Sequence, residues 1–393
     1  MKEKLLEEVG IFTSDLDNLF KQLINHQYAF AIWRIPNTDI SYLLIDLKTE
    51  IASPNTSLEE LHDCFVINPY KSNHPPKPHV LAGDIIVSYI NNAPEISISP
   101  KVSAKDIEEL SLNLASKTDT ADPTDDSLET YTHDFSELVS QAIQEIKNGS
   151  ANKIVLSRYE EFTLKPNFSL NKCFSELQSS YPNAFCYMCY TQEYGLWVGA
   201  SPERLISIEN RRYFKTESLA GTQYLPGIDN LSDVAWTQKE IEEQAMVSRY
   251  IIGCLKKIRL REFEESGPKT VRAGKLVHLK TEYKVDMVET NMPDLGSIML
   301  ELLHPTSAVC GTPFESARQF IEKHENYDRS LYAGFLGPVN FKDSTNLFVN
   351  LRCMQLFDSK ARLYAGAGIT EDSNPAKEYQ ETVNKMLTLR DLL

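Results

Sequence analysis

The stretch that decides the fold is Leu363-Tyr-Ala-Gly-Ala-Gly-Ile369, an apolar segment that contains two glycines near the end of the chain. Glycine lets the backbone approach a bound molecule closely, because it carries no side chain. Glu378 and Glu381 follow on a segment with helical character, and acids three residues apart project to the same side of a helix. The two carboxylates could hold a hard cation against an anionic ligand, or they could form a solvated acidic face.

The chain has 393 residues, with 40 Lys and Arg against 55 Asp and Glu, so its formal net charge is −15. This excess of acids argues against a broad surface for nucleic acid or an anionic membrane, so an anionic substrate must be captured locally. No apolar stretch approaches the ~20 residues that a membrane-spanning helix needs, and the N-terminus lacks the apolar core of a secretory signal. We therefore expect a cytoplasmic protein whose seven cysteines are reduced thiols.

Cys186 and Cys189 form a C-x-x-C pair within Ala184-Phe-Cys-Tyr-Met-Cys-Tyr190, an apolar and aromatic run that indicates a strand. Positions three apart on a strand point to opposite faces of the sheet. The two cysteines are therefore predicted to be core residues, and a shared metal or redox site is disfavoured.

The order of the elements predicts an α+β fold with large antiparallel sheets flanked by helices, because strands and helices mix without a strict βαβ rhythm. Residues 1–110 hold short strand-like runs and are expected to form a variable N-terminal portion that completes the core. Residues 111–131 are rich in Ser, Thr and Asp and are interpreted as a polar connector to the working region, 132–393. In that region we expect strands at 153–158, 194–199, 204–208, 346–352 and 361–365, and helices at 134–147, at about 233–258 and after Pro313.

Lys153 and Glu203 are the candidates for acid–base chemistry. Lys153 opens an apolar strand, where desolvation would lower its pKa and make it usable as a base. The alternative is a strand-edge lysine with its ammonium in water. Glu203 follows a proline at the end of a strand-like run, where a raised pKa would make it a general acid, and the alternative is a turn residue paired with Arg204.

A cluster of acids, Glu240, Glu242 and Glu243, begins the long helix predicted at 233–258. The helix dipole alone explains such a cluster, because acids are stabilised at a helix N-terminus. A metal site shared with Glu378 and Glu381 would explain it as well, since Mg²⁺ typically takes one or two protein carboxylates and completes its octahedron with water and substrate oxygens.

Three further residues could contact a ligand. Arg352 is expected to end a strand, where it could clamp a carboxylate with the Tyr364 hydroxyl as a second donor. His304 precedes a proline in a turn-forming segment and could hydrogen-bond a ligand or serve as a structural loop residue. No glycine-rich nucleotide signature occurs in the sequence, so a phosphate loop is not supported.

Taken together, these segments resemble the chorismate-utilising enzymes, which include isochorismate synthase, salicylate synthase, anthranilate synthase component I and aminodeoxychorismate synthase component I. The resemblance runs in the family's order from about residue 130 to the end of the chain. The matching runs are Lys153-Ile-Val-Leu-Ser-Arg158, Gly199-Ala-Ser-Pro-Glu203, Glu217-Ser-Leu-Ala-Gly-Thr222, His304-Pro-Thr306 with Val309-Cys-Gly-Thr-Pro313, Tyr327-Asp-Arg-Ser-Leu-Tyr-Ala-Gly334, Leu363-Tyr-Ala-Gly-Ala-Gly-Ile369 and Pro375-Ala-Lys-Glu-Tyr-Gln-Glu-Thr382 with Lys385.

The resemblance implies a fold like that of anthranilate synthase component I, with 132–393 as the chorismate-binding catalytic region. It implies Mg²⁺ as the cofactor, held by Glu243, Glu378 and Glu381. One departure weakens this assignment: Lys239-Glu-Ile-Glu-Glu-Gln244 keeps the family's glutamate at Glu243 but replaces a neighbouring arginine and histidine. The substrate-binding residues that the resemblance implies are Ala220, Gly221, Thr222, His304, Arg352, Tyr364, Gly366, Gly368 and Lys385.

Two positions distinguish between family members. In the resembled family, the enzymes that attack chorismate with water carry a lysine at the position of Lys153. Aminating anthranilate synthases usually have glutamine there. Aminodeoxychorismate synthases often carry a nucleophilic lysine where this chain has Ala220. The resemblance therefore implies water as the nucleophile and no glutamine amidotransferase subunit.

The expected activity is that of an isochorismate synthase: Mg²⁺-dependent isomerisation of chorismate to isochorismate, with Lys153 as base and Glu203 as acid. Salicylate synthase, which forms the same intermediate and then eliminates pyruvate, is the alternative. A binding protein without turnover is a more distant one. The sequence leaves open whether the product enters menaquinone or siderophore biosynthesis, and it leaves the oligomeric state open, with a monomer plausible.

Overall fold

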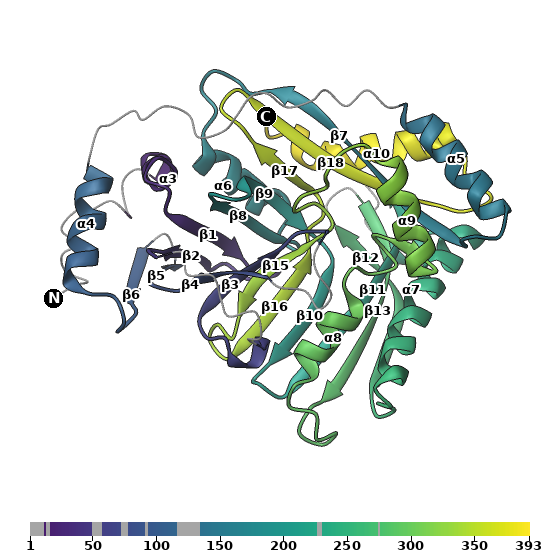
Figure 1. Cartoon of the computed structure of the whole chain (residues 1–393), viewed down its shortest axis with the longest axis horizontal. Helices are drawn as coiled ribbons and strands as arrows, with labels where there is room; N and C mark the ends of the chain where they lie inside the picture. The colour runs from purple at the N-terminus through teal and green to yellow at the C-terminus, as the bar shows by residue number, and fades with distance from the viewer. Residues whose placement is uncertain are drawn as a thin grey trace.

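Two large antiparallel sheets form the framework of the protein (Figure 1). The computed structural model describes residues 12, 16–48, 57–71, 78–90, 93–115, 134–225, 230–273 and 276–393. Within these residues every pair of neighbouring strands is antiparallel. The α+β class with large antiparallel sheets is therefore confirmed.

The larger sheet has ten strands. In spatial order they are β14 (Gly311–Thr312), β7 (Lys153–Thr163), β18 (Lys360–Ile369), β17 (Cys353–Leu356), β9 (Gly195–Ser201), β8 (Phe185–Thr191), β1 (Ala29–Arg34), β2 (Ser41–Asp46), β5 (Ile85–Ile90) and β6 (Ala93–Ile98).

The smaller sheet has eight strands. Their order is β12 (Glu264–Ala273), β13 (Leu276–Asp286), β11 (Tyr213–Tyr224), β10 (Arg204–Glu209), β16 (Ser344–Val349), β15 (Phe335–Val339), β3 (Cys64–Asn68) and β4 (His79–Ala82). The N-terminal portion thus supplies strands to both sheets.

Helices cover the outer faces of both sheets (Figure 1). Helices α5, α9 and α10 pack on β7 and β18, whereas α7 and α8 pack on β11 and β10. The described helices are α3 (Leu16–Asn25), α4 (Ala104–Ala115), α5 (Phe135–Lys147), α6 (Leu170–Ser180), α7 (Gln238–Lys257), α8 (Leu295–Leu303), α9 (Phe314–His324) and α10 (Pro375–Arg390), with single turns η1 (Leu58–Glu60) and η2 (Leu231–Asp233). Among them, none combines the length and the apolar character needed to cross a membrane.

Strand β8 shows how alternation builds two cores. Phe185 and Cys189 belong to the core between the sheets, whereas Cys186 and Met188 belong to the core under helices α3, α4, α6 and α10. Since side chains three apart on a strand point to opposite faces, the two cysteines cannot share a metal or a disulfide. Both are buried free thiols, so their prediction as core residues is confirmed.

The boundaries of several elements depart from the sequence analysis. Helix α7 begins at Gln238 and not near residue 233, because Thr237 and Glu240 form a capping box that starts the helix there. Of the connector predicted at 111–131, residues 111–115 lie in α4 and the rest lies outside the described residues. Helix α5 is confirmed, with the Asp134 carboxylate accepting a hydrogen bond from Ser136 N at 2.8 Å.

The chain crosses between the two sheets at two places that lie side by side. It leaves the larger sheet between β9 and β10, through Pro202 and Glu203, and it returns between β16 and β17, through Leu351 and Arg352. The crossings are joined by hydrogen bonds from Val349 N to Glu203 O (3.0 Å) and from Ala200 N to Arg352 O (3.0 Å). Glu203 and Arg352 are therefore held at the seam between the sheets.

The strand expected at 346–352 is wrong at its C-terminal end. Strand β16 stops at Val349, and Arg352 has a left-handed backbone with φ of 50°. The Asn350 side chain stabilises this turn, because it accepts a hydrogen bond from the Tyr187 hydroxyl (2.5 Å) and donates one to Leu331 O (2.9 Å). The turn is required to carry the chain from one sheet to the other.

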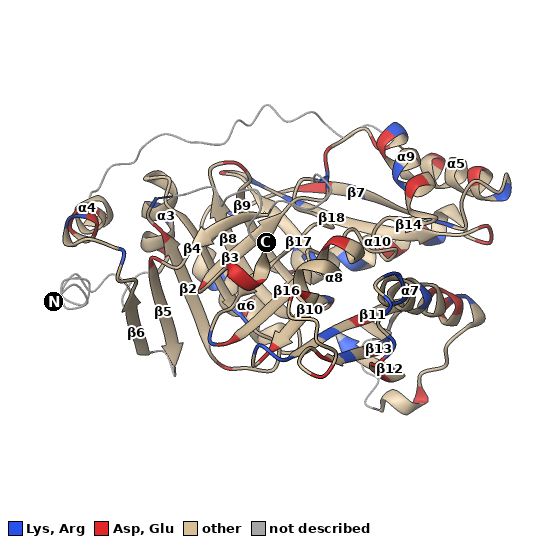
Figure 2. Cartoon of the chain, turned by 60° about the horizontal axis from the view of Figure 1, so that its bottom comes forward, with Lys and Arg blue, Asp and Glu red and all other residues tan. Residues whose placement is uncertain are grey.

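Charged side chains of both signs lie along the outer helices, including α7 and α9 (Figure 2). The strands of the two sheets carry fewer of them. With a net charge of −15, an anion gains nothing from the overall field and must be bound by specific cations. The site is therefore best sought where cations are buried.

Phe348→Ala tests how strongly the core couples the two sheets. The rings of Phe185 and Phe348 stack face to face, with centroids 4.2 Å apart and planes at 4°, and both are buried. We expect the substitution to lower the free energy of unfolding by about 3–5 kcal/mol in urea denaturation. Leu112→Ala, at a position 73% exposed, is the control and should change stability by less than about 0.5 kcal/mol. Equal effects of the two substitutions would contradict this packing.

Candidate active site

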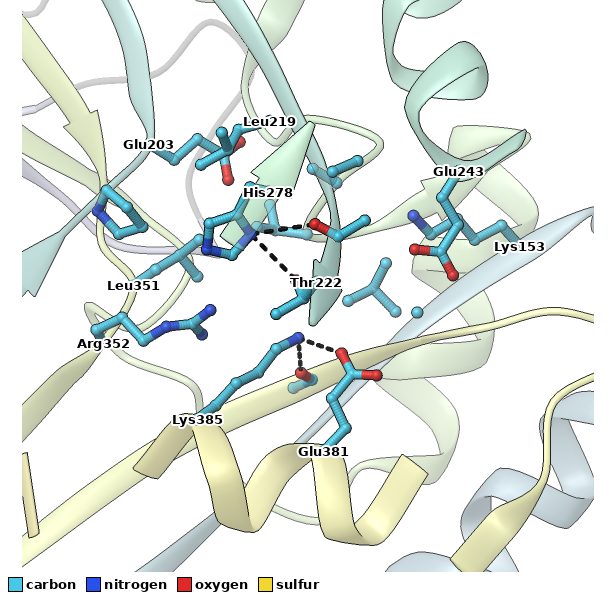
Figure 3. A pocket seen from close by; sticks show the side chains of 18 of the residues that line it. Lys153, Glu203, Leu219, Thr222, Glu243, His278, Leu351, Arg352, Glu381 and Lys385 are labelled. Carbon is cyan, nitrogen blue, oxygen red and sulfur yellow. Dashed lines mark hydrogen bonds and ion pairs between the residues drawn. The ribbon is translucent and has the colours of Figure 1, made fainter. Parts of the chain in front are cut away.

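A cavity lies where the two crossings meet β7, β11, β13, β18, α7 and α10 (Figure 3). It gathers most of the residues that the sequence analysis selected: Lys153, Glu203, Ala220, Gly221, Thr222, Glu243, Arg352, Gly366, Gly368, Glu381 and Lys385. The remaining lining residues were not predicted: Val155, Pro202, Leu219, His278, Ala308, Val309, Tyr332 and Leu351.

Glycines of β18 make room for the polar side chains of the cavity. Strand β18 pairs with β7 in a register that places Gly368 opposite Val155. A Cβ atom on Gly368 would lie 2.7 Å from Cε of Lys153, and one on Gly366 would lie 2.8 Å from the Tyr332 hydroxyl. The close approach that the Gly-Ala-Gly run predicted therefore involves the protein's own lysine and tyrosine.

Two basic side chains face the cavity without a partner. Within the part of the chain that the structure describes, neither Lys153 Nζ nor the Arg352 guanidinium has a hydrogen-bond acceptor or a carboxylate at contact distance. Lys385 differs, because it pairs with Glu381 at 2.6 Å and donates to Gly366 O at 2.9 Å. Lys153 and Arg352 lie on opposite sides of the cavity (Figure 3), so a ligand between them would meet a basic side chain on each side.

Glu203 is a buried carboxyl group on the side of the cavity opposite Lys153 (Figure 3). Burial, together with the negative charge of Glu217, raises its pKa to about 8, against the opposing effects of Arg352, Lys153 and Lys385. It therefore carries a proton at neutral pH and can donate it. The alternative pairing with Arg204 is not observed: its guanidinium lies over the Phe348 ring, and its buried Nε has no hydrogen-bond partner among the described residues.

His278 on β13 is a lining residue that the sequence analysis missed. Its Nδ1 lies 3.1 Å from Gly221 O and 3.2 Å from the Thr222 hydroxyl. Burial lowers its pKa to about 3, so the ring is neutral, and a proton on Nδ1 donated to Gly221 O leaves Nε2 as an acceptor. Nε2 is buried and has no partner among the described residues, so it is available to a hydroxyl of a ligand. Only the register of β13 beside β11 reveals this role.

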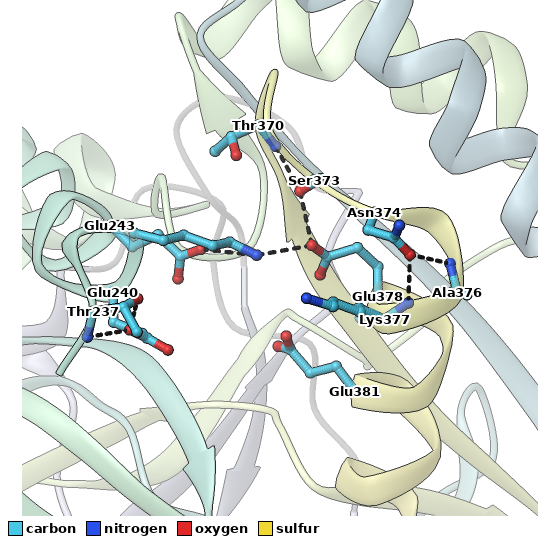
Figure 4. Close-up of polar contacts among 12 residues, drawn as sticks. Thr237, Glu240, Glu243, Thr370, Ser373, Asn374, Ala376, Lys377, Glu378 and Glu381 are labelled. Atoms are coloured by element: carbon cyan, nitrogen blue, oxygen red, sulfur yellow. Dashed lines mark hydrogen bonds and ion pairs between the residues drawn. The ribbon is translucent and has the colours of Figure 1, made fainter. Parts of the chain in front are cut away.

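The three predicted metal ligands are divided between two neighbouring contacts (Figure 4). Lys239 Nζ lies 2.8 Å from Glu378 Oε1 and 3.9 Å from Glu243 Oε1, whereas Glu381 pairs with Lys385. Among the described residues, no three acidic, histidine or cysteine side chains are grouped as a ready-made metal site. Glu243 and Glu378 nevertheless stabilise a cation between them, and two carboxylates are the number that Mg²⁺ typically takes from a protein.

The pKa shifts of Glu243 and Glu381 also differ in direction. Burial raises the pKa of Glu243. Burial also opposes the charged form of Glu381, but the Lys385 ammonium outweighs it, so the pKa of Glu381 is lowered. Glu381 is thus paired with Lys385, whereas Glu243 and Glu378 share the Lys239 ammonium between them.

Two predicted ligand contacts lie outside the cavity lining. His304 is buried, with Nε2 3.3 Å from Asn68 Nδ2 and its ring edge-on to Phe335. These contacts agree with the structural role that the sequence analysis gave as one of two alternatives for this histidine. Tyr364 points into the core, where its ring stacks on Tyr332 and its hydroxyl lies 3.3 Å from Gln355 Oε1. The hydroxyl that reaches the cavity belongs to Tyr332, because Tyr364 is covered by it.

The sequence profile of the family described as chorismate binding enzyme matches residues 83–393. The chain belongs to this family. It is 27% identical over 261 residues to the vibriobactin-specific isochorismate synthase of Vibrio cholerae serotype O1, an alignment that covers 64% of each chain. The chain thus spans slightly less than two thirds of this curated relative.

Solved structures of chorismate-related enzymes share the fold. The menaquinone-specific isochorismate synthase MenF from Escherichia coli matches with a TM-score of 0.74 and 23% identity over 95% of this chain and 90% of that one. Anthranilate synthase component I from Streptococcus pneumoniae matches with a TM-score of 0.64 and 21% identity, over 92% and 89%. The predicted resemblance of the fold to anthranilate synthase component I is confirmed.

The basic side chains of the cavity fit the membership of this chain in a chorismate-binding family. Chorismate carries two carboxylates, and the basic side chains of Lys153, Arg352 and Lys385 line the cavity from different elements. Such local cations compensate for the unfavourable net charge of the chain.

Glu203→Gln tests the protonation state of the buried carboxyl through stability. Between pH 4.5 and about 8 the folded protein holds a proton that the unfolded chain has released, so the stability of the native protein falls as pH rises across this window. The variant lacks this loss. Its stability relative to the native protein should rise by an amount on the order of a few kcal/mol from pH 5 to pH 8 and then level off.

Urea denaturation at several pH values measures this difference. Glu371→Gln, at an exposed position, is the control and should change stability little at any pH. A Glu203→Gln difference that stays constant from pH 5 to pH 8 would show that Glu203 is already ionised in the folded protein.

Proposed function

We propose that this chorismate-binding enzyme is an isochorismate synthase, which converts chorismate to isochorismate with Mg²⁺ as cofactor. The observation that carries the proposal is the arrangement of Lys153 and Glu203, an unpaired amine and a protonated carboxyl on opposite sides of one cavity. A base and an acid on the two sides of a planar ring are what an addition and an elimination at different ring carbons require.

The reaction is a 1,5 displacement. Lys153, in its amine form, removes a proton from a water molecule, whose oxygen forms a bond to ring C2. The double bonds shift, the C4–O bond breaks, and Glu203 gives its proton to the departing hydroxyl, which leaves as water. One water enters and one leaves, so substrate and product are isomers and no oxidant or reductant is needed. Proton exchange with solvent restores both residues.

The remaining lining residues hold the substrate. Arg352 would clamp the carboxylate of the enolpyruvyl group, and the Tyr332 hydroxyl takes the donor role that the sequence analysis gave to Tyr364. His278 Nε2, an unpartnered acceptor, would bind a ring hydroxyl. These contacts orient the ring between base and acid, and orientation is a large part of the rate that an enzyme supplies.

Glu243 and Glu378 would hold the Mg²⁺ ion, with Glu381 beside them. When bound, the ion would neutralise the ring carboxylate and draw electron density toward it. The Lys239 ammonium, which now lies between Glu243 and Glu378, would have to move aside. Glu381 and Lys385 can stay paired, because one or two carboxylates suffice for Mg²⁺.

Water is favoured as the nucleophile by two features. Lys153 faces the cavity as a base, and Ala220 offers no amine where the resembled aminodeoxychorismate synthases often carry a nucleophilic lysine. The similar proteins include a vibriobactin-specific and a menaquinone-specific isochorismate synthase, so both pathways are candidate destinations of the product.

Product analysis tests the proposal. Purified protein is incubated with chorismate and Mg²⁺, and the products are separated by chromatography, with EDTA as the metal-free control. We expect isochorismate in the native reaction, none with EDTA, and a loss of turnover of ~10²-fold or more in Lys153→Ala and Glu203→Gln, with substrate binding retained. Salicylate and pyruvate accumulating without a second enzyme would assign the chain to the salicylate synthases instead. Chorismate binding without any turnover would overturn both assignments.

A further inference from the structure

Glu217 on β11 lies behind Glu203, outside the cavity lining, and both of its oxygens are used. Oε1 accepts a hydrogen bond from Arg204 N at 3.0 Å, and Oε2 pairs with Lys280 Nζ at 2.5 Å. The Glu217 side chain is only 4% exposed. Because Arg204 directly follows Glu203, this carboxylate is attached to the backbone that carries the acid.

The charges around Glu203 come from four elements. Lys153 on β7, Arg352 in the second crossing and Lys385 on α10 are cations, and each favours the ionised form of Glu203. Glu217 on β11 is the one acid among the charged groups that act most strongly on it. Against three cations, burial and Glu217 together keep the proton on Glu203.

We propose that Glu217 is a positioning residue for Glu203: it fixes the crossing through Arg204 N, and its negative charge favours the protonated form of the acid. The proposal rests on the proposed role of Glu203 as proton donor. Lys280 has the complementary task of pairing with the second oxygen of the buried Glu217 side chain.

Strand pairing alone does not explain why Lys280 pairs with the buried Glu217. Lys280 is also 3.9 Å from Glu282, which is far more exposed than Glu217, so an ordinary surface ion pair was available to it. A buried ion pair costs desolvation that an apolar pair would avoid, and an ionised acid next to a second buried carboxyl costs more. Such a cost is expected at a functional site where the Glu203 carboxyl must keep its proton.

The experiment compares Glu217→Gln with two matched variants. Gln keeps an acceptor for Arg204 N but removes the charge, whereas Glu217→Asp keeps the charge but shortens the reach to Arg204. Glu282→Gln removes the other acid near Lys280. The readout is the titration of the Glu203 carboxyl by ¹³C NMR of glutamate-labelled protein, assigned by its loss in Glu203→Gln.

We expect Glu217→Gln to shift the Glu203 midpoint to lower pH by roughly one unit, and Glu282→Gln to leave it unchanged. Glu217→Asp should retain a midpoint near the native one, with a lowered kcat and an unchanged KM if positioning is disturbed. The alkaline limb of kcat/KM should move with the NMR midpoint in Glu217→Gln.

Equal Glu203 midpoints in native protein, Glu217→Gln and Glu282→Gln would overturn the inference. If Glu217→Gln does not fold, Lys280→Met replaces it: an unneutralised Glu217 should raise the Glu203 midpoint, and an unchanged midpoint would again overturn the inference. The NMR titration needs no turnover, so it is independent of the product assay. A protein that makes no isochorismate but shows the shift would refute the proposed function and leave the coupling of Glu217 to Glu203 intact.

Discussion

The hydrogen bonds between the two sheet crossings are the constraint on which the rest of the structure depends. Val349 N to Glu203 O and Ala200 N to Arg352 O tie together two segments that lie about 150 residues apart in the chain. Each crossing leaves one sheet for the other at the seam, and Glu203 and Arg352 both line the cavity there. The two residues are thereby fixed at one place by the topology of the backbone, while loops elsewhere can vary without moving them.

A second device stiffens the opposite side of the seam. The buried Arg329 guanidinium donates to Val155 O at 2.8 Å and to Val309 O at 2.9 Å, and its partner Glu325 accepts from Ser157 N at 2.7 Å. These bonds hold strand β7 at Val155 and at Ser157, two and four residues from Lys153. A buried ion pair of this kind contributes little net stability, but it defines one geometry. The site therefore combines a rigid frame with groups that are costly to bury, namely two unpaired basic side chains and a protonated acid.

The sequence predicted the class of fold, four of the eight described helices (α5, α7, α9 and α10) and a set of fourteen candidate site residues, eleven of which the fold brings around one cavity. It was informative where a short motif carries the chemistry, as in Gly366 and Gly368, whose missing side chains leave room for Tyr332 and Lys153. It failed where the role depends on a distant partner. His278 becomes a cavity residue only through its register beside Thr222, and Tyr332 lines the cavity where the sequence analysis selected Tyr364. The contact of Lys239 with Glu378 likewise joins segments that no local pattern relates.

The claim that most needs a direct test is that water attacks one face of chorismate while Glu203 releases the hydroxyl from the other. Turnover in ¹⁸O-labelled water, with the product isolated early and analysed by mass spectrometry, measures the origin of the new hydroxyl. The account predicts that isochorismate gains one ¹⁸O atom at C2 and that none enters the carboxylates. Isochorismate whose C2 hydroxyl carries the original oxygen of chorismate would contradict it, because the hydroxyl would then have moved within the substrate without a water molecule activated by Lys153.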